Sequence, residues 1–249
     1  MNHFSFMWMA IVLISAICMN ESIAEDNARP VMQAIHVEVM PEIDGKLNEI
    51  IWQKTPSYTL SFSKDKTGKP KETASVKLAW NKQGLYLAVQ LEDSDLLAYD
   101  DRDEEMHFKY GDALELFVKP RDNSYYWEMY VTPRSNKTTI FIFRSISNKF
   151  FTDPLKGHDF RDLKVCAVTQ GSLNDISDSD KDWTAEMWVP ASYMKHFKEP
   201  WGPNGNWTVF CGRYNYTKDL DHPELSMYPP ISKTNYHLTK EYALLQFLK

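Results

Sequence analysis

The 249-residue sequence has few cysteines, few glycines and no excess of positive charge. It contains 3 Cys and 9 Gly, and its 28 Lys and Arg are outnumbered by 34 Asp and Glu, which gives a formal net charge of −6. Nucleic-acid phosphates require clustered Lys and Arg, so this balance argues against a nucleic-acid partner. Phosphate-binding loops, dinucleotide fingerprints and nucleophile elbows are absent from the sequence, and its histidines are too scattered to indicate a zinc site.

A long apolar run occurs only at residues 7–19, which is too short to span a bilayer comfortably. The small-x-small pattern Ser22-Ile-Ala24 follows it, as expected of a cleavage site. Residues 1–24 are therefore predicted to be a signal peptide, and the mature chain 25–249 is expected to be secreted or periplasmic and free of the membrane. A retained membrane anchor is the alternative, because residues 1–6 contain no Lys or Arg. The mature chain keeps Cys166 and Cys211, which form either a disulfide or two buried thiols.

Short segments of alternating apolar and polar residues dominate the remaining sequence. This period of two, bounded by turn residues, is typical of half-buried strands. It predicts an all-β fold, a single antiparallel β-sandwich of roughly ten to twelve strands with one or two short helices. The clearest segments are Ala74–Trp80, Gly84–Asp93, Gly111–Phe117, Tyr125–Val131 and Trp183–Pro190.

Two of these segments place carboxylates and aromatic rings on one face. Side chains alternate across a strand, so the aliphatic residues of 112–118 and 125–131 should face the core. Glu115 and Phe117, with Tyr126, Glu128 and Tyr130 on a neighbouring strand, should then face outward. Carboxylates accept hydrogen bonds from sugar hydroxyls, and aromatic rings stack on the apolar faces of pyranoses. This face is therefore predicted to bind a sugar.

Three further residues complete the predicted site. Tyr110, at a loop-to-strand junction, and Tyr236, in the loop before the last strand, are expected to be exposed and to stack on the sugar. Arg213, in the strand predicted at 207–216, is expected to hydrogen-bond sugar hydroxyls or to pair with the carboxylates. Because glycosidases use two carboxylates, Glu115 and Glu128 also admit a hydrolase interpretation, but no catalytic residue is assigned.

Two acidic loops could bind a structural calcium ion. Asp93-Ser-Asp95 and the Asp-rich stretch 175–182 supply oxygen ligands of the kind that calcium prefers, whereas ordinary acidic turns would have the same composition. The second stretch lacks the glycine and closing glutamate of an EF-hand loop. No metal ligand is therefore assigned, and no other cofactor is expected.

The order of these segments resembles that of family 9 carbohydrate-binding modules. The resemblance covers most of residues 33–249 and includes Val76-Lys-Leu-Ala-Trp80, Gly111-Asp-Ala-Leu-Glu-Leu-Phe117 and the closing Tyr242-Ala-Leu-Leu-Gln-Phe247. It implies a β-sandwich without catalytic activity that binds glucan or xylan chains or their ends, and in some members structural calcium.

The resemblance also assigns site residues. Glu115 matches the family's sugar-contacting acid, and Tyr236 falls where the second of two ring-stacking aromatics is expected. The first aromatic position is occupied by Lys109, so Phe108 or Tyr110 would have to replace it. We therefore predict a monomeric, exported, non-enzymatic protein that binds a polysaccharide or an oligosaccharide through Tyr110, Glu115, Glu128, Arg213 and Tyr236.

Two other functions stay open. The same sandwich superfamily contains haem-binding cytochrome domains, for which Met106-His107 would be the place to look for an iron ligand. A glycoside hydrolase would instead use Glu115, and its release of reducing sugar would be lost in Glu115→Gln.

Overall fold

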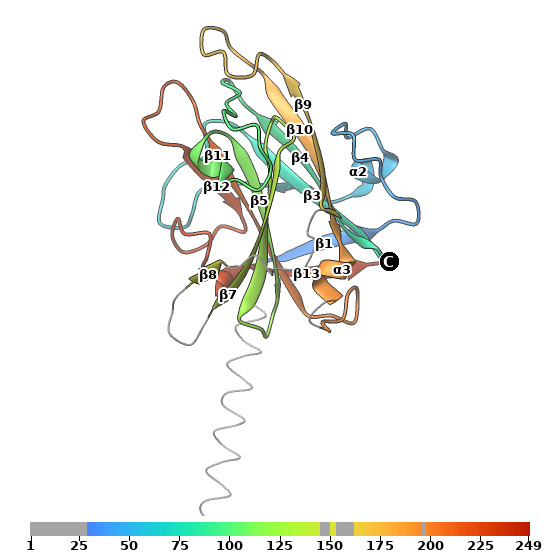
Figure 1. The fold of residues 1–249 in the computed structure, drawn as a ribbon. Coiled ribbons are helices and arrows are strands. Elements are labelled where there is room, and N and C mark those ends of the chain that lie inside the picture. The colour runs from blue at the N-terminus through green and yellow to red at the C-terminus, as the bar shows by residue number, and fades with distance from the viewer. Residues whose placement is uncertain (1–28, 145–149, 153–161, 196–197) are drawn as a thin grey trace, which may run out of the picture. The chain divides into compact units, whose positions relative to one another are not determined.

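Strands make up nearly all of the regular structure in the computed structural model, which describes residues 29–144, 150–152, 162–195 and 198–249 (Figure 1). The strands are β1 (Val31–His36), β2 (Tyr58–Thr59), β3 (Ala74–Asn81), β4 (Gly84–Glu92), β5 (Ala113–Pro120), β6 (Tyr125–Val131), β7 (Lys137–Arg144), β8 (Phe150–Thr152), β9 (Lys164–Gln170), β10 (Asp182–Pro190), β11 (Trp207–Asn215), β12 (Glu224–Tyr228) and β13 (Ala243–Leu248). The helices described are α2 (Ile50–Lys54) and α3 (Ala191–Lys195), with 3-10 turns η1 (His107–Lys109) and η3 (Thr239–Glu241). The all-β class and the short helices are confirmed. The predicted signal peptide lies outside the described residues.

The strands form one continuous hydrogen-bonded path in the order β8-β7-β6-β5-β11-β13-β1-β3-β4-β10-β9, while β12 pairs with β11 and β2 with β3. Strands β3, β4, β10 and β9 lie side by side in one half of this path (Figure 1). The expectation of purely antiparallel pairing is wrong at β1, which runs parallel to both β13 and β3. Strands β13 and β1 join the two halves, because β13 pairs with β11 on one side and β1 pairs with β3 on the other.

The main hydrophobic core lies between the two halves of the path. Aliphatic residues of β3, β4 and β10 pack there against those of β5, β6 and β11. The period of two is the cause, because it gives each strand one apolar face that is stable only when removed from water. Four tryptophans of the strands are also buried in it: Trp80, Trp127, Trp183 and Trp207.

A second apolar cluster covers the opposite face of β5, β6 and β11. It contains Phe117, Tyr126 and Phe210 from these strands, together with Tyr236 and Tyr242 from the chain that follows β12. The face predicted to be outward is thus largely covered by residues 225–242. Phe117 and Tyr126 face away from the main core as expected, but they are buried beneath this covering segment.

Candidate functional site

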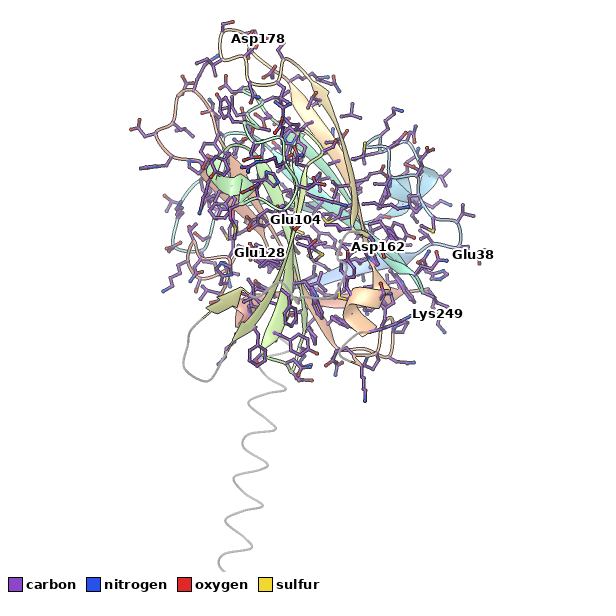
Figure 2. The ribbon with its side chains drawn as sticks, viewed as in Figure 1. Glu38, Glu104, Glu128, Asp162, Asp178 and Lys249 are labelled. Carbon is purple, nitrogen blue, oxygen red and sulfur yellow. The ribbon has the colours of Figure 1, made fainter. Side chains whose placement is uncertain are left out.

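Strands β5 and β6 bring two carboxylates together on the face away from the main core. Glu115 of β5 is opposite Tyr130 of β6, and Phe117 is opposite Glu128. Glu128 is labelled in Figure 2. Residues of one face alternate along each strand, so Glu115 and Glu128 lie diagonally across the pair, as the sequence predicted. Both are buried, with exposed fractions of 2% and 4%.

Tyr130 is hydrogen-bonded to one member of this acid pair. Its hydroxyl donates a hydrogen bond to Glu128 Oε1. The other oxygens are less well satisfied, because Glu115 Oε1 and Glu128 Oε2 are buried and have no hydrogen-bond partner among the described residues. Unpaired buried oxygens are costly, and their natural partner is a ligand that donates hydrogen bonds.

Burial changes the protonation of both carboxyl groups. It is the main cause that raises the pKa of Glu128 to about 7, partly opposed by the hydrogen bond from Tyr130. The pKa of Glu115 is raised well above its ordinary value, first by burial and then by the negative charge of Glu128. The desolvated charged forms are disfavoured, so the pair retains a proton near neutral pH.

A cleft of ≈ 250 Å³ opens above the acid pair. It is lined by Phe108, Glu115, Glu128, Tyr214, Leu225, Thr234, Asn235, Tyr236 and His237. Strands β5 and β6 thus form the floor of the cleft, while η1 and the covering segment 225–242 form its walls. Aromatic rings beside polar groups suit a ligand with both an apolar face and hydroxyl groups.

Tyr236 lines this cleft, but the expectation that it is exposed is wrong. Only 5% of its surface is exposed, and its hydroxyl donates to the backbone oxygens of Arg213, at 2.8 Å, and Ser226, at 3.0 Å. Its ring lies over Gly212, where two ring atoms would be 2.7 Å from an added Cβ. A glycine in the middle of β11 is what lets this ring approach the sheet.

Tyr110 is exposed as predicted, with an exposed fraction of 44%. It follows η1 and is not among the residues that line the cleft. Phe108, two residues earlier, lines it instead, and its ring lies 5.2 Å from that of Tyr214. Of the two aromatics expected to replace Lys109, Phe108 lines the cleft and Tyr110 does not.

Arg213 does not face this cleft, which corrects its predicted role. It lies on the opposite face of β11 and is 1% exposed. Its guanidinium Nη2 donates to Asp93 Oδ2 at 3.0 Å and to the Glu92 backbone oxygen at 2.7 Å. The alternation of side chains along β11 decides this outcome, because Gly212 occupies the position beside Glu115.

His237 is a site residue that the sequence analysis missed. Its Nδ1 lies 2.8 Å from the Tyr126 hydroxyl and 3.9 Å from Glu128 Oε2. Thr234 and Asn235 also reach the cleft from the same loop. In the sequence, the polar residues Thr234 and Asn235 beside Tyr236 were the feature that could have pointed to this loop. Only the folding of the loop over β11 brings these residues to the acid pair.

The acidic segments considered for calcium are occupied by protein donors. Asp93 accepts hydrogen bonds from Trp183 Nε1 and Arg213, while Asp95 is paired with Lys218 at 3.2 Å. Asp180 accepts two backbone N–H groups, those of Leu96 and Ser172, which closes its loop. Structural calcium stays a prediction.

Elsewhere in the described residues, Asp44, Glu49 and Glu186 bring carboxylate oxygens within 4.8 Å of one another. The Glu186 oxygens already accept hydrogen bonds from Trp52 Nε1 and from the backbone N–H groups of Asp44 and Gly45. These contacts account for the Glu186 carboxylate, whereas Glu49 Oε2 is buried and has no hydrogen-bond partner among the described residues.

The residues considered for a disulfide and for haem binding do not line the cleft. Cys166 and Cys211 are free thiols, which supports the thiol alternative over the disulfide. His107 is buried in η1 and lines neither the cleft above Glu115 nor a second cleft near Asp162. Haem binding gains no support from these positions.

The fold is all-β, and its cleft is lined by polar and aromatic residues. Residues 43–155 match the family model described as "Carbohydrate family 9 binding domain-like". The resemblance to family 9 carbohydrate-binding modules is thus confirmed over that segment, which contains Phe108, Glu115 and Glu128.

Solved structures share the fold over most of the chain. A candidate carbohydrate-binding protein from Bacteroides uniformis is 15% identical with a TM-score of 0.64, and the match covers 88% of this chain and 99% of that one. A family 9 module from Caldicellulosiruptor kristjanssonii in complex with cellotriose is 13% identical with a TM-score of 0.59, covering 87% and 92%. The same kind of module in complex with glucose gives 13% identity and a TM-score of 0.57, covering 87% and 95%. No curated protein matches the chain.

The described residues contain no helix of the length and apolarity needed to cross a membrane.

Proposed function

We propose that this protein is a non-catalytic carbohydrate-binding domain of sandwich-like architecture whose cleft above Glu115 and Glu128 holds one sugar ring. The observation that carries the proposal is the combination of unpaired buried carboxylate oxygens with aromatic walls in one small cleft. Sugar hydroxyls donate to carboxylates, and the C–H face of a pyranose packs on a ring such as that of Phe108.

The proposed ligand is a glucan or xylan chain or its end. The small volume of the cleft favours a single terminal ring over a long internal stretch of chain. Cellotriose and glucose are the ligands named for two solved modules of the same fold. The apolar run 7–19 and Ser22-Ile-Ala24 support export of the chain as a secreted or periplasmic protein.

Titration calorimetry of the mature chain tests this function. Cello- and xylo-oligosaccharides are titrated in parallel with borohydride-reduced versions. Saturable binding supports the proposal, and its loss on reduction identifies capture of a reducing end. No heat with any sugar would overturn the proposal.

Two aromatic variants map the site. Phe108→Ala should weaken binding by about 1–3 kcal/mol, the range for losing one buried apolar side chain. Tyr110→Ala is the matched control, because Tyr110 lies beside η1 but outside the cleft lining. We expect Tyr110→Ala to leave binding of glucose unchanged and to weaken only longer oligosaccharides that extend beyond the cleft. Equal effects of both variants on glucose would contradict this map.

A glycoside hydrolase is the second candidate, and the raised pKa of Glu128 is the observation that favours it. A carboxyl group that keeps its proton near pH 7 is what a general acid requires. Release of reducing sugar by the wild-type chain, lost in Glu115→Gln and Glu128→Gln, would establish hydrolysis. Binding without release supports the non-catalytic function.

A further inference from the structure

The acid pair in the cleft lacks a balancing positive charge. Among the described residues, no Lys or Arg forms an ion pair with Glu115 or Glu128. Arg213 faces the other side of β11 and is held by Asp93. The nearest basic group is the His237 ring, whose Nδ1 lies 3.9 Å from Glu128 Oε2.

Two buried carboxyl groups are energetically unfavourable when no cation or hydrogen-bond donor is paired with them. A buried carboxylate is normally paired with a cation or fully hydrogen-bonded, because removal from water costs several kcal/mol per ion. In this cleft Glu115 Oε1 and Glu128 Oε2 are both buried and unpaired. A proton can neutralise one group of the pair, and the raised pKa values of both are consistent with this. A ligand cation would neutralise it as well.

The walls also suit a cation. The rings of Phe108, Tyr214 and Tyr236 border the cleft, with ring centroids 5.2 Å apart for the first two and 5.5 Å for the last two. The face of an aromatic ring attracts a positive charge within about 6 Å of its centroid. Lys109 already uses this attraction, because its Nζ lies 5.7 Å from the centroid of Phe108. Aromatic walls above two acids therefore form a site for an ammonium group.

We propose that the cleft binds a sugar carrying an ammonium group, such as a 2-amino sugar, more tightly than the same sugar with a hydroxyl or an acetamido group. The inference rests on the proposed function and specifies its substrate class. The ammonium group would donate hydrogen bonds to Glu115 Oε1 and Glu128 Oε2, and the proton held by the pair would be released to solvent. Sugars with a carboxylate, such as uronic acids, would be repelled by the same pair.

Several titratable groups face the acid pair and determine the pH range over which the ammonium preference should occur. Tyr130 from β6 and Tyr214 from β11 stay neutral, because burial and the two carboxylates raise the pKa of each hydroxyl far above neutrality. Burial, and then the negative charge of Glu115, raises the pKa of the Tyr236 hydroxyl in the same direction. The basic groups nearby are His237, whose Nδ1 lies 3.9 Å from Glu128 Oε2, and Lys109, whose Nζ lies 5.7 Å from the centroid of Phe108. The ammonium preference should therefore follow the ionisation of Glu115 and Glu128.

Calorimetry on the full chain tests the proposal with β-1,4-linked trisaccharides of glucose, N-acetylglucosamine and glucosamine. The titrations are run at about pH 6.5, below the pKa of an ordinary α-amino group, in buffers of different ionisation enthalpy. We expect the glucosamine trimer to bind at least tenfold more tightly than cellotriose and to release up to one proton.

Three variants separate the site from general charge attraction, because the chain has a net charge of −6. Glu115→Gln and Glu128→Gln should abolish the preference, whereas Glu38→Gln on the exposed surface should retain it. Thermal unfolding of each variant verifies that it is folded. A preference that persists in both cleft variants would overturn the inference.

The outcomes also separate this inference from the proposed function. Equal or tighter binding of cellotriose would overturn the ammonium preference and leave carbohydrate binding intact. Failure of these three trisaccharides and of the xylo-oligosaccharides to bind would overturn both.

Discussion

Glu128→Gln should make the protein more stable at alkaline pH and change little in acid. The folded-state pKa of Glu128 is raised from 4.5 to about 7 by burial, so the folded protein binds this proton more tightly than the unfolded chain does. Its favourable contribution is complete below the unfolded pKa and is lost as the pH rises through about 7. Glutamine carries no charge, and its side-chain oxygen can still accept the hydrogen bond from Tyr130.

The size of this change in stability follows from the shift in the pKa of Glu128. Each pKa unit corresponds to about 1.36 kcal/mol, so a rise of about two and a half units amounts to about 3 kcal/mol. Relative to wild type, the free energy of unfolding of Glu128→Gln should therefore increase by about 3 kcal/mol between about pH 4 and pH 8. Removing this charge also relieves Glu115, whose pKa Glu128 helps to raise.

Urea unfolding followed by tryptophan fluorescence at a series of pH values measures this difference. Glu38→Gln is the matched control, because Glu38 is exposed at the surface after β1 (Figure 2). A difference between wild type and Glu128→Gln that does not change with pH would refute the reasoning, since it would mean that Glu128 is solvated in the folded state.

Two further predictions concern the supports of the cleft, and both are measured by the same urea titrations. Gly212→Ala should destabilise the protein by about 1–3 kcal/mol through overpacking against the Tyr236 ring, and adding Tyr236→Leu should remove most of that penalty. A stable Gly212→Ala variant with unchanged sugar binding would show that the ring moves freely. Arg213→Met should cost about 3–5 kcal/mol, because it leaves the buried Asp93 carboxylate unpaired, and Asp93→Asn in the same chain should restore part of the loss. Without that partial rescue, Arg213 would stabilise the fold by packing alone.

The position of Arg213 also changes how the cleft is understood. A cation beside Glu115 would have neutralised the acid pair, and the pair would then interact with a ligand mainly through hydrogen bonds. Because Gly212 stands opposite Glu115 in the register of β5 and β11, no cationic side chain lies beside Glu115 at this position. The same glycine admits the Tyr236 ring, so one small residue determines both the charge and the aromatic wall of the site.

The sequence by itself determined the strands of the core and the pairing of the two acids. The period of two in 113–118 and 125–131 fixed which side chains face inward, and this local rule placed Glu115 and Glu128 on one face. The exposure of Tyr110 also followed from its place at a junction between a loop and a strand. These features depend on alternation and turn chemistry, which neighbouring residues specify.

Only the tertiary structure decided what covers that face. The burial of Tyr236 and the approach of His237 depend on residues 225–242 folding over β11. The opposite orientation of Arg213 depends on the register of β11 against β5. The contacts of Tyr236 with β11 join residues 23 positions apart, whereas His237 reaches Tyr126 across 111 positions. No local pattern encodes these contacts, because packing among distant segments selects one arrangement of the loop and one register of the strand.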